Sequence, residues 1–522
     1  MNICKPAAVI ATLLLSGFVA DAQKHNWQSM DLQKDSVFGI SAEKAYSELL
    51  KGKKSKTVVV AVIDSGIDTT HEDLKSILWI NAKEKRANGK DDDKNHYADD
   101  IYGWNFIGSP KGNVDFDNLE LTRMVRQQQK QFGSLNSVSK DTAGLYQYKQ
   151  LKNKYDLKLS EAQQTLVGIS RFVEMLDTML VKLGNPNPTA ADLQAYTPQN
   201  PAEAQIKQVI SAQLDRYPDF KTFRTTELDA AVKHYKEQVD YSLNLDYDPR
   251  PIVGDDYSNA TERYYGSGDA TGPDADHGTH VAGIIGAGRN NSMGIDGIAD
   301  NVRIMSVRAV PNGDERDKDV ANAIRYATDN GAKVINMSFG KSYSPNKDVV
   351  DEAVKYAISK DVLLVHAAGN DAENNDVTPN YPSRVYQNGD TATAWIEVGA
   401  SGPEDDETLA APFSNYGKIN VDVFAPGVGI YSPTPGSHYE YHDGTSMAAP
   451  VVAGLAALIR SYYPKLSAVQ VKDIILKSVV KVEHPVNIMV EDQPKSVQMT
   501  ELCRTGGVVN AYKALELAAT YK

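Results

Sequence analysis

Runs of apolar residues alternate with amphipathic stretches along most of the chain after residue 56. The stretch 56–66, KTVVVAVIDSG, is almost continuous in β-branched residues, which is typical of a strand buried on both faces. Comparable apolar runs follow at 302–310, 332–340, 362–370, 395–401 and 419–427. The intervals 317–331 and 347–361 have the periodicity of amphipathic helices, and Gly331 closes the first. This alternation predicts an α/β fold, a mostly parallel, doubly wound sheet with helices on both faces.

Residues 107–255 interrupt the alternation, because they are rich in Gln, Lys, Tyr and Leu and lack β-branched runs. Apolar residues recur there at alternating steps of three and four, as in a short coiled coil: Leu166, Ile169, Val173, Leu176, Leu180 and Leu183. The run GNPNP at 184–188 ends this helix, and further helical patterns follow to residue 243. A disordered linker is the alternative, but the apolar seam is too regular for one. We therefore expect an α-helical insertion in the α/β core.

Composition narrows the class of protein. Apolar residues make up 41% of the chain and charged residues 24%, as in soluble globular proteins. The net charge of −13 argues against nucleic acid or an anionic membrane as a partner. Nothing in the sequence indicates an oligomeric state.

The first residues have the features of an export signal. Lys5 precedes an apolar run from about Pro6 to Ala20, and Ala20-Asp21-Ala22 supplies small residues before a cut. A membrane anchor is the alternative, but the apolar run is shorter than the roughly 20 residues that a spanning helix needs. We expect a secreted protein, extracellular or periplasmic, with no membrane span after signal removal. Cys4 is then lost, and Cys503 cannot form an internal disulfide.

Three stretches place reactive side chains at the ends of predicted strands or the starts of predicted helices. Asp64 ends the first strand, His277 lies where DADHGTHVAGIIGAG opens a helix, and Ser446 begins the apolar helix in HDGTSMAAPVVAGLAALI. In a parallel sheet the carboxyl ends of the strands meet at one edge, so these residues can come together. A serine hydroxyl needs a neutral imidazole to take its proton and a carboxylate to fix the tautomer of that imidazole. The three residues predict a nucleophilic hydrolase.

His280 offers an alternative. Two histidines three residues apart, His277 and His280, could both lie on one helix face and bind zinc. The stretch lacks the glutamate of an H-E-x-x-H helix and has no evident third ligand nearby. We therefore expect His277 to be the base and His280 to be a buried structural residue.

At these residues the chain resembles a known family. VIDSGID with Asp64, HGTHVAG with His277 and GTSMAAP with Ser446 resemble the three signature motifs of the subtilisin-like serine peptidases, the subtilases. The resemblance covers about residues 56–105 and 256–515. It implies an exported serine endopeptidase that hydrolyses polypeptide substrates through an Asp–His–Ser triad and an acyl-enzyme. It implies no cofactor for catalysis.

Further segments extend the resemblance. AAGN around Asn370 is similar to the family's oxyanion segment, and a side-chain amide there could donate to a developing oxyanion. NMSFG is similar to the strand edge that pairs with the substrate backbone, and its residues are Ser338, Phe339 and Gly340. Met337, Phe339 and Ala368 indicate an apolar pocket wall. His71 resembles a structural histidine of the family. An inactive peptide-binding scaffold is the alternative, but every catalytic residue is present.

Two departures from the family pattern stand out. The interval between Asp64 and His277 is much longer than in compact members, because of the insertion, which could overhang the cleft or be a peripheral decoration. Only residues 23 to about 55 separate the signal from the first strand, too few for the usual inhibitory pro-domain. The predicted division is a signal peptide at 1–22, two parts of one peptidase domain at 23–106 and 256–522, and the insertion at 107–255.

The acidic run DDDKNHYADD at 91–100 is the candidate metal site. Asp91, Asp93 and Asn95 at alternate positions resemble the opening of a calcium loop. The EF-hand pattern needs Gly where His96 stands, and Glu is missing at the twelfth position, so the full motif fails. A structural calcium ion bound by these three residues and a solvated acidic loop both remain open.

Overall fold

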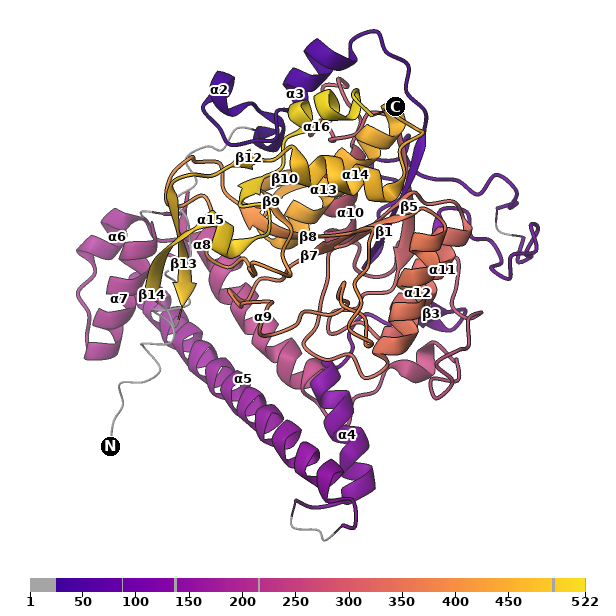
Figure 1. Cartoon of the computed structure of the whole chain (residues 1–522). Helices are drawn as coiled ribbons and strands as arrows, with labels where there is room; N and C mark the ends of the chain where they lie inside the picture. The colour runs from indigo at the N-terminus through magenta and orange to yellow at the C-terminus, as the bar shows by residue number, and fades with distance from the viewer. Residues whose placement is uncertain (1–24, 87, 136–138, 215, 491–492, 522) are drawn as a thin grey trace. The chain divides into compact units, whose positions relative to one another are not determined.

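The parallel sheet predicted from the apolar runs is present in the computed structural model, which describes residues 25–86, 88–135, 139–214, 216–490 and 493–521 (Figure 1). The strand order is β12-β15-β9-β8-β7-β6-β1-β5-β2. The strands are β1 (Val58–Asp64), β2 (Gly103–Asn105), β5 (Val302–Arg308), β6 (Val334–Met337), β7 (Leu363–Ala367), β8 (Trp395–Ser401), β9 (Val423–Pro426), β12 (Val480–Lys481) and β15 (Gly507–Val508). All neighbours pair in parallel except β12 and β15 at one edge. The predicted signal peptide lies outside the described residues.

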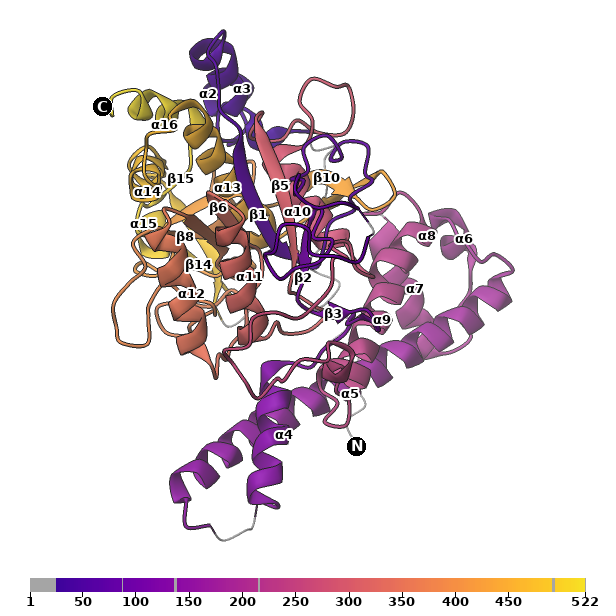
Figure 2. The ribbon, with the colours of Figure 1, turned by 90° about the vertical axis from the view of Figure 1, so that its right-hand side faces the viewer.

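Alternate residues of the central strand β1 enter two separate apolar cores. Val60 and Val62 of β1 pack on one face, and Ala61 and Ile63 pack on the other. Four helices cover the first face: α10 (Asp276–Gly286), α13 (Thr445–Tyr462), α14 (Ala468–Lys477) and α16 (Ala511–Ala518). Helices α11 (Asp317–Asp329) and α12 (Lys347–Ser359) cover the second face (Figure 2). The doubly wound α/β fold is therefore confirmed.

The last of the predicted strands begins well inside its apolar run. The run 419–427 predicts a strand throughout, whereas β9 begins at Val423. The Asp376 carboxylate accepts hydrogen bonds from the backbone N–H groups of Ile419 and Asn420, which bends this segment into a turn. Ile419 is left 62% exposed. A side chain far away in the sequence therefore decides where the strand starts.

The N-terminal segment is built into this core. It contains η1 (Trp27–Ser29), α2 (Leu32–Asp35), α3 (Ala42–Ala45) and the π-helical turn η2 (Tyr46–Leu50). Trp27 is 1% exposed, and its indole N–H points to the carbonyl oxygens of Val428 and Gly429 at 3.2 and 3.3 Å. Ile40 accepts a hydrogen bond from Ala511, the first residue of α16. The segment thus belongs to the same core as the sheet.

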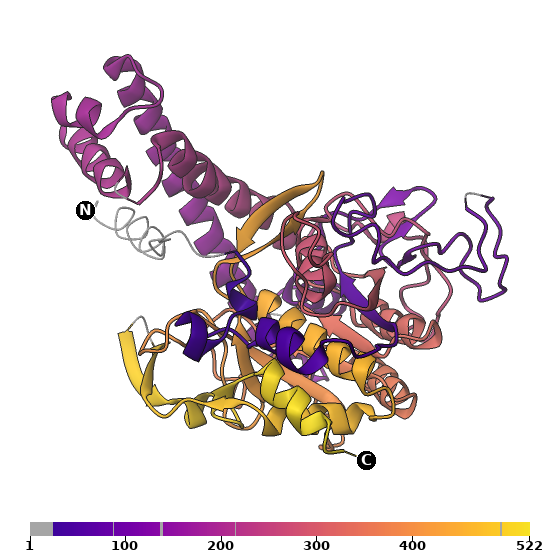
Figure 3. The ribbon, with the colours of Figure 1, turned by 90° about the horizontal axis from the view of Figure 1, so that it is seen from above.

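A separate compact unit comprises Leu121–Asp248. Its helices are α4 (Glu120–Phe132), α5 (Thr142–Leu183), α6 (Ala190–Ala195), α7 (Pro201–Leu214), α8 (Phe220–Phe223), η3 (Arg224–Asp229), α9 (Ala230–Glu237) and η4 (Gln238–Ser242). The first residue of α4, Glu120, lies just outside the unit. In this bundle α7, α9 and η4 contact the long helix α5, and α6 and α8 contact α7 (Figure 3). Helix α5 ends with Gly184 in the left-handed conformation, φ 73°. Within the predicted seam, Ile169, Leu176 and Leu180 are buried.

The helical unit is smaller than the predicted insertion. Residues 107–120 and 249–255 group with the sheet domain. They include the short hairpin of β3 (Gly108–Ser109) and β4 (Gly112–Asn113) and the turn η5 (Arg250–Ile252). Ser109 Oγ donates to the carbonyl oxygen of Ile252 at 2.5 Å, so the two ends are tied together outside the helical unit. The predicted bounds of the insertion, 107 and 255, rest on the absence of β-branched runs, which these loops also lack.

The remaining elements are peripheral to the sheet. They are the hairpin β10 (Ile430–Thr434) and β11 (His438–His442), the hairpin β13 (Pro485–Val490) and β14 (Gln493–Gln498), and the short helix α15 (Met499–Leu502). Within the described part of the chain, every helix is too short or too polar to cross a membrane.

Candidate active site

Asp64 and His277 meet at the carboxyl end of the sheet. Asp64 is the last residue of β1, is 1% exposed, and places Oδ1 2.7 Å from Nδ1 of His277. His277 is the second residue of α10, and its side chain is 39% exposed. The helix can come this close because a Cβ on the next residue, Gly278, would lie 2.1 Å from the carbonyl oxygen of Gly66. The carboxylate accepts from Nδ1–H, which leaves Nε2 as the basic nitrogen.

The electrostatic setting favours protonation of His277. Burial by itself lowers the pKa of the imidazole, but the adjacent Asp64 carboxylate outweighs it and raises the pKa of His277 above its ordinary value. Asp276 and Asp274 act in the same direction from further away. The pair therefore has the electrostatics of a base held ready to become an imidazolium.

Ser446 lies at the start of the buried helix α13. Its Oγ donates to the carbonyl oxygen of Ser338 at 3.1 Å, and Ser338 Oγ donates to the carbonyl oxygen of Ser446 at 2.9 Å. The second bond has a local cause. Pro450, four residues on, has no N–H, so the Ser446 carbonyl lacks its helical donor and takes the Ser338 hydroxyl instead. Ser446 is thereby fixed against the predicted substrate edge.

Asn370 follows β7 and faces the start of α13. Its Oδ1 accepts from the backbone N–H of Thr445 and from the Thr445 hydroxyl, both at 2.9 Å. With the oxygen occupied in this way, Nδ2 is the end of the amide that can donate to a ligand. A Cβ on Gly444, whose φ is 151°, would lie 3.5 Å from that Nδ2. Glycine at this position therefore keeps the space in front of the amide open.

Three other asparagines hold the turn that carries Asn370. Asn375, Asn380 and Asn415 each donate a side-chain amide to the carbonyl oxygen of Ala368, at 2.8, 3.1 and 3.0 Å. Asn415 is 3% exposed, and its Oδ1 accepts from the N–H groups of Asp371 and Glu373. Sequence reasoning missed these residues, because no local pattern relates them. Thr445 was also missed, although its place beside Ser446 in GTSMAAP was a usable signal.

The predicted substrate edge continues β6 beyond the sheet. Ser338, Phe339 and Gly340 follow Met337, the last residue of that strand. Ser338 contacts Ser446 as described, whereas Gly340 lies against Asn380, whose side-chain atoms would be 2.3–2.7 Å from a Cβ at Gly340. Phe339 is 9% exposed and Ala368 is fully buried.

The other two histidines singled out by the sequence are structural. His280 is fully buried, and its Nε2 donates to the carbonyl oxygen of Glu440 in β11 at 3.2 Å. Burial, with the stacked ring of His442 at 4.1 Å, lowers the pKa of His280 to about 2. His71 is also buried, with Nε2 3.1 Å from the carbonyl oxygen of His438. Within the described ranges, the one group of three potential metal ligands includes neither His277 nor His280.

That group lies in the acidic loop and includes one residue that sequence reasoning missed. Carboxylate oxygens of Glu84, Asp91 and Asp93 all lie within 4.8 Å of one another. Calcium takes oxygen ligands at about 2.3–2.6 Å, so three oxygens at this spacing fit one ion. Asn95 is placed differently, because its Oδ1 accepts from Tyr97 N–H and its Nδ2 donates to Asp100. An acid seven residues before Asp91 was the available signal for Glu84.

Comparisons with known proteins show what the chain is similar to. The profile of the subtilase family matches residues 55–501. A thermophilic serine proteinase of a Bacillus species is 46% identical over 186 residues, which are 35% of this chain and 42% of that protein. Thermitase of Thermoactinomyces vulgaris is 38% identical over 241 residues, which are 46% of this chain and 75% of that protein. Subtilisin Savinase of Lederbergia lenta is 39% identical over 38% of this chain and 67% of that protein.

The likeness is partial in length. The chain spans less than half of the Bacillus proteinase that it matches. A solved protease structure from Pseudoalteromonas arctica is similar over 48% of this chain and 78% of the protease chain, at 30% identity and with a TM-score of 0.40.

Proposed function

The chain belongs to the subtilase family, and on that premise we propose that it is an exported serine endopeptidase that cleaves polypeptides with Asp64, His277 and Ser446. The observation that carries the proposal is the 2.7 Å contact between the buried Asp64 carboxylate and His277 Nδ1, at the edge of the sheet where α13 begins and Ser446 is its second residue. A carboxylate in this position fixes the imidazole tautomer whose Nε2 accepts a proton.

Acylation uses each of these groups in turn. As Ser446 Oγ attacks the carbonyl carbon of the scissile peptide bond, its proton passes to His277 Nε2 and the carbonyl oxygen becomes an oxyanion. Asn370 Nδ2 and the N–H of Ser446, which has no partner within its own helix so near the start of α13, are the proposed donors to that oxygen. The C–N bond then breaks as His277 returns the proton to the leaving amine.

Deacylation repeats the sequence with water. His277 Nε2 takes a proton from a water molecule whose oxygen attacks the acyl carbon, and the proton finally returns to Ser446 Oγ. For acylation the Ser446 hydroxyl first leaves its hydrogen bond to Ser338, since at rest it donates there. Such contacts commonly tighten only when substrate is bound.

Ser446→Ala tests the mechanism. We expect the variant to lose covalent labelling by a serine-directed fluorophosphonate and to lose cleavage of unfolded casein by a factor of about 10⁶, as for removal of a triad nucleophile. Thr445→Ser is the matched control, because it keeps a hydroxyl next to the nucleophile and should retain labelling. Cleavage retained by a folded Ser446→Ala protein would refute the triad.

We also propose a structural calcium ion in the acidic loop, held by Glu84, Asp91 and Asp93. The all-oxygen donor set and the spacing of its carboxylates support this assignment. The ion would neutralise three converging negative charges and take no part in catalysis. Asn95, the third ligand predicted from the sequence, lies in the same loop, and its backbone N–H donates to Asp91 and Asp93.

A further inference from the structure

The predicted substrate edge has a definite end. Lys341 follows Gly340, and its backbone N–H and carbonyl both pair with Tyr381 at 2.9 Å. Successive peptide groups of an extended strand point to opposite sides, so Ser338 and Gly340 face the other way, the side on which Ser446 lies. A peptide paired with this edge has its first residue upstream of the scissile bond opposite Ser338. Its third residue lies opposite Gly340 and its fourth opposite Lys341.

At that fourth position the Lys341 side chain crosses to a different segment. Its ammonium lies 2.8 Å from the carbonyl oxygen of Glu315, 2.8 Å from Asp317 Oδ1 and 2.9 Å from Glu120 Oε2. Glu315 lies in the connection between β5 and α11, and Asp317 is the first residue of α11. In the sheet, β1 separates β5 from β6. The lysine therefore links the segments that follow β5 and β6, above the strand that ends at Asp64.

The space around this ammonium is filled. Glu120, Glu315, Asp317 and Lys341 are each at most 5% exposed. Burial raises the pKa of Glu315 to about 8, so its carboxyl group is mostly protonated at neutral pH, and the charged partners of the lysine are Glu120 and Asp317. A buried ammonium with two carboxylates and a carbonyl as partners is satisfied in place, and removing one partner is costly.

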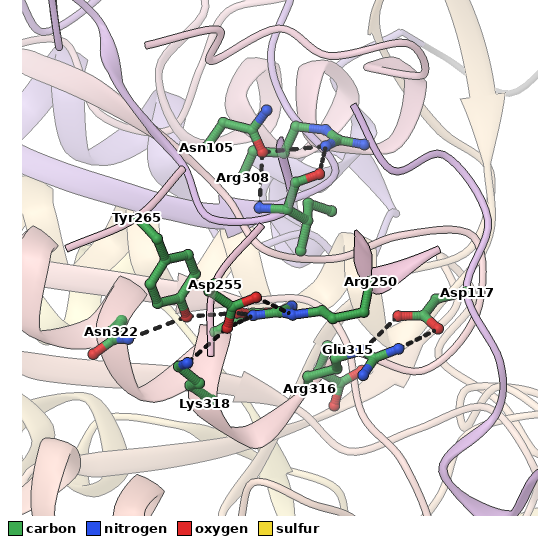
Figure 4. A network of polar contacts seen from close by, with 12 residues as sticks. Asn105, Asp117, Arg250, Asp255, Tyr265, Arg308, Glu315, Arg316, Lys318 and Asn322 are labelled. Atoms are coloured by element: carbon green, nitrogen blue, oxygen red, sulfur yellow. Dashed lines mark hydrogen bonds and ion pairs between the residues drawn. The ribbon is translucent and has the colours of Figure 1, made fainter. Parts of the chain in front are cut away.

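The facing segment is itself held firmly. Arg316 binds Asp117 through two hydrogen bonds of 2.7 and 2.9 Å, and Arg250 and Lys318 both bind Asp255 (Figure 4). Phe116 forms a bridge with Asn312. Contacts of Arg316 with Asp117 and of Asn312 with Phe116 therefore hold the connection between β5 and α11 in place. Lys341 joins it to the substrate edge through the carbonyl oxygen of Glu315.

From this arrangement we propose that Lys341 is a specificity-determining residue that ends the substrate groove after the third residue upstream of the scissile bond. The inference rests on the proposed peptidase function. The fourth residue finds no open pocket and no free partner at Glu315 O, because the ammonium occupies that position. Longer polypeptides are still cleaved, but their upstream portion leaves the groove at Gly340.

A peptide series tests this. Peptides with one fixed residue on each side of the scissile bond carry two, three, four or five residues upstream, with leucine at the fourth position. In the wild type we expect kcat/KM to increase from two to three residues and to change less than twofold when the fourth is added. In Lys341→Gly/Glu120→Gln, which empties the position without leaving an extra buried charge, the fourth residue should increase kcat/KM at least fivefold.

Controls separate the possible failures. Glu120→Gln alone keeps the lysine on Asp317 and should behave like the wild type. A tenfold gain from the fourth residue in the wild type, or no gain in a folded double variant, overturns the inference. If nothing is cleaved, the peptidase function fails. The groove is then judged by the Kd of the same peptides for Ser446→Ala, where the fourth residue should add less than twofold and a tenfold gain refutes the inference.

Discussion

The Asp64 carboxylate, on which His277 depends, has few other hydrogen-bond partners. One oxygen of Asp64 contacts His277 and accepts from Ser65 N–H, and the other, Oδ2, has no hydrogen-bond partner among the described residues. A buried carboxylate that is poorly solvated interacts strongly with a neighbouring cation. The balance between burial and this carboxylate therefore sets the proton affinity of the base.

The pH dependence follows from that balance. The pKa of His277 is raised, and the base acts only when neutral, so kcat/KM should increase with pH through a midpoint above about 6.5, the ordinary histidine value. In Asp64→Asn the carboxylate is lost, burial remains, and the midpoint of the His277 titration should move to lower pH. The NMR titration of the imidazole measures this, alongside the kcat/KM profile of the wild type.

Asn370→Ala is the matched control for the titration. It removes a proposed oxyanion donor and should reduce kcat by roughly 100- to 1,000-fold, the range known for removal of such a donor from subtilisin, a member of the same family. It should leave the His277 titration in place. A wild-type midpoint below 6.5, or an Asp64→Asn midpoint that does not move, would contradict the proposed role of Asp64.

At the scale of a single element, the acidic loop is shaped by hydrogen bonds between its own carboxylates and its own backbone. Its carboxylates already bind its own backbone. Asp91 accepts from Asn95 and His96 N–H, and Glu84 accepts from Asp92 and Asp93 N–H. These bonds shape the loop, but the convergence of three carboxylates is repulsive unless a cation is bound.

Removal of calcium should therefore destabilise the protein. We expect a chelator to lower the Tm, since an ion held at a concentration 100-fold above its Kd stabilises the folded state by about 2.7 kcal/mol. In Asp91→Ala the Tm should be lower from the start and insensitive to chelator. Differential scanning calorimetry with and without EDTA measures both effects.

A neighbour within the loop provides the control. Asp92 accepts from Lys85 N–H and the Asn88 amide and lies outside the group of three. Asp92→Asn should retain the chelator-sensitive shift. If the wild type shows no shift at all, the calcium assignment is wrong.

At the scale of the whole molecule, the helical unit has its own core. Leu176, Met179, Ile206, Ile210 and Phe223 pack together within Leu121–Asp248 and are at most 1% exposed. A segment of this size with a continuous core is large enough to fold alone. Its stability should therefore be separable from that of the sheet domain.

The isolated unit tests this separation. Residues 121–248 expressed alone should be helical by circular dichroism and melt cooperatively. Leu176→Ala should cost about 2–5 kcal/mol of unfolding free energy, because it leaves a cavity in the core. Val181→Ala, on the same helix but 81% exposed, should change stability by less than about 0.5 kcal/mol. A non-cooperative melt, or equal effects of both substitutions, would argue against an autonomous unit.

The sequence alone determined the sheet, the helices that cover it and the three residues of the proposed triad. Buried parallel strands and amphipathic helices have periodicities that can be read locally, and the motifs around Asp64, His277 and Ser446 are contiguous. His280 could be separated from His277 because only one histidine was needed by the other two motifs.

The tertiary structure decided contacts between residues distant in the chain. Asn415 joins Asn375 and Asn380 at the carbonyl oxygen of Ala368, and Lys341 reaches Glu120. Trp27 is buried in the core of the sheet domain, beside Val428, which lies 401 residues further along the chain. No local periodicity encodes these pairings, because each depends on how loops from different strands pack at one edge of the sheet. The hydrogen bonds of Asp376 to Ile419 and Asn420 likewise set where β9 starts.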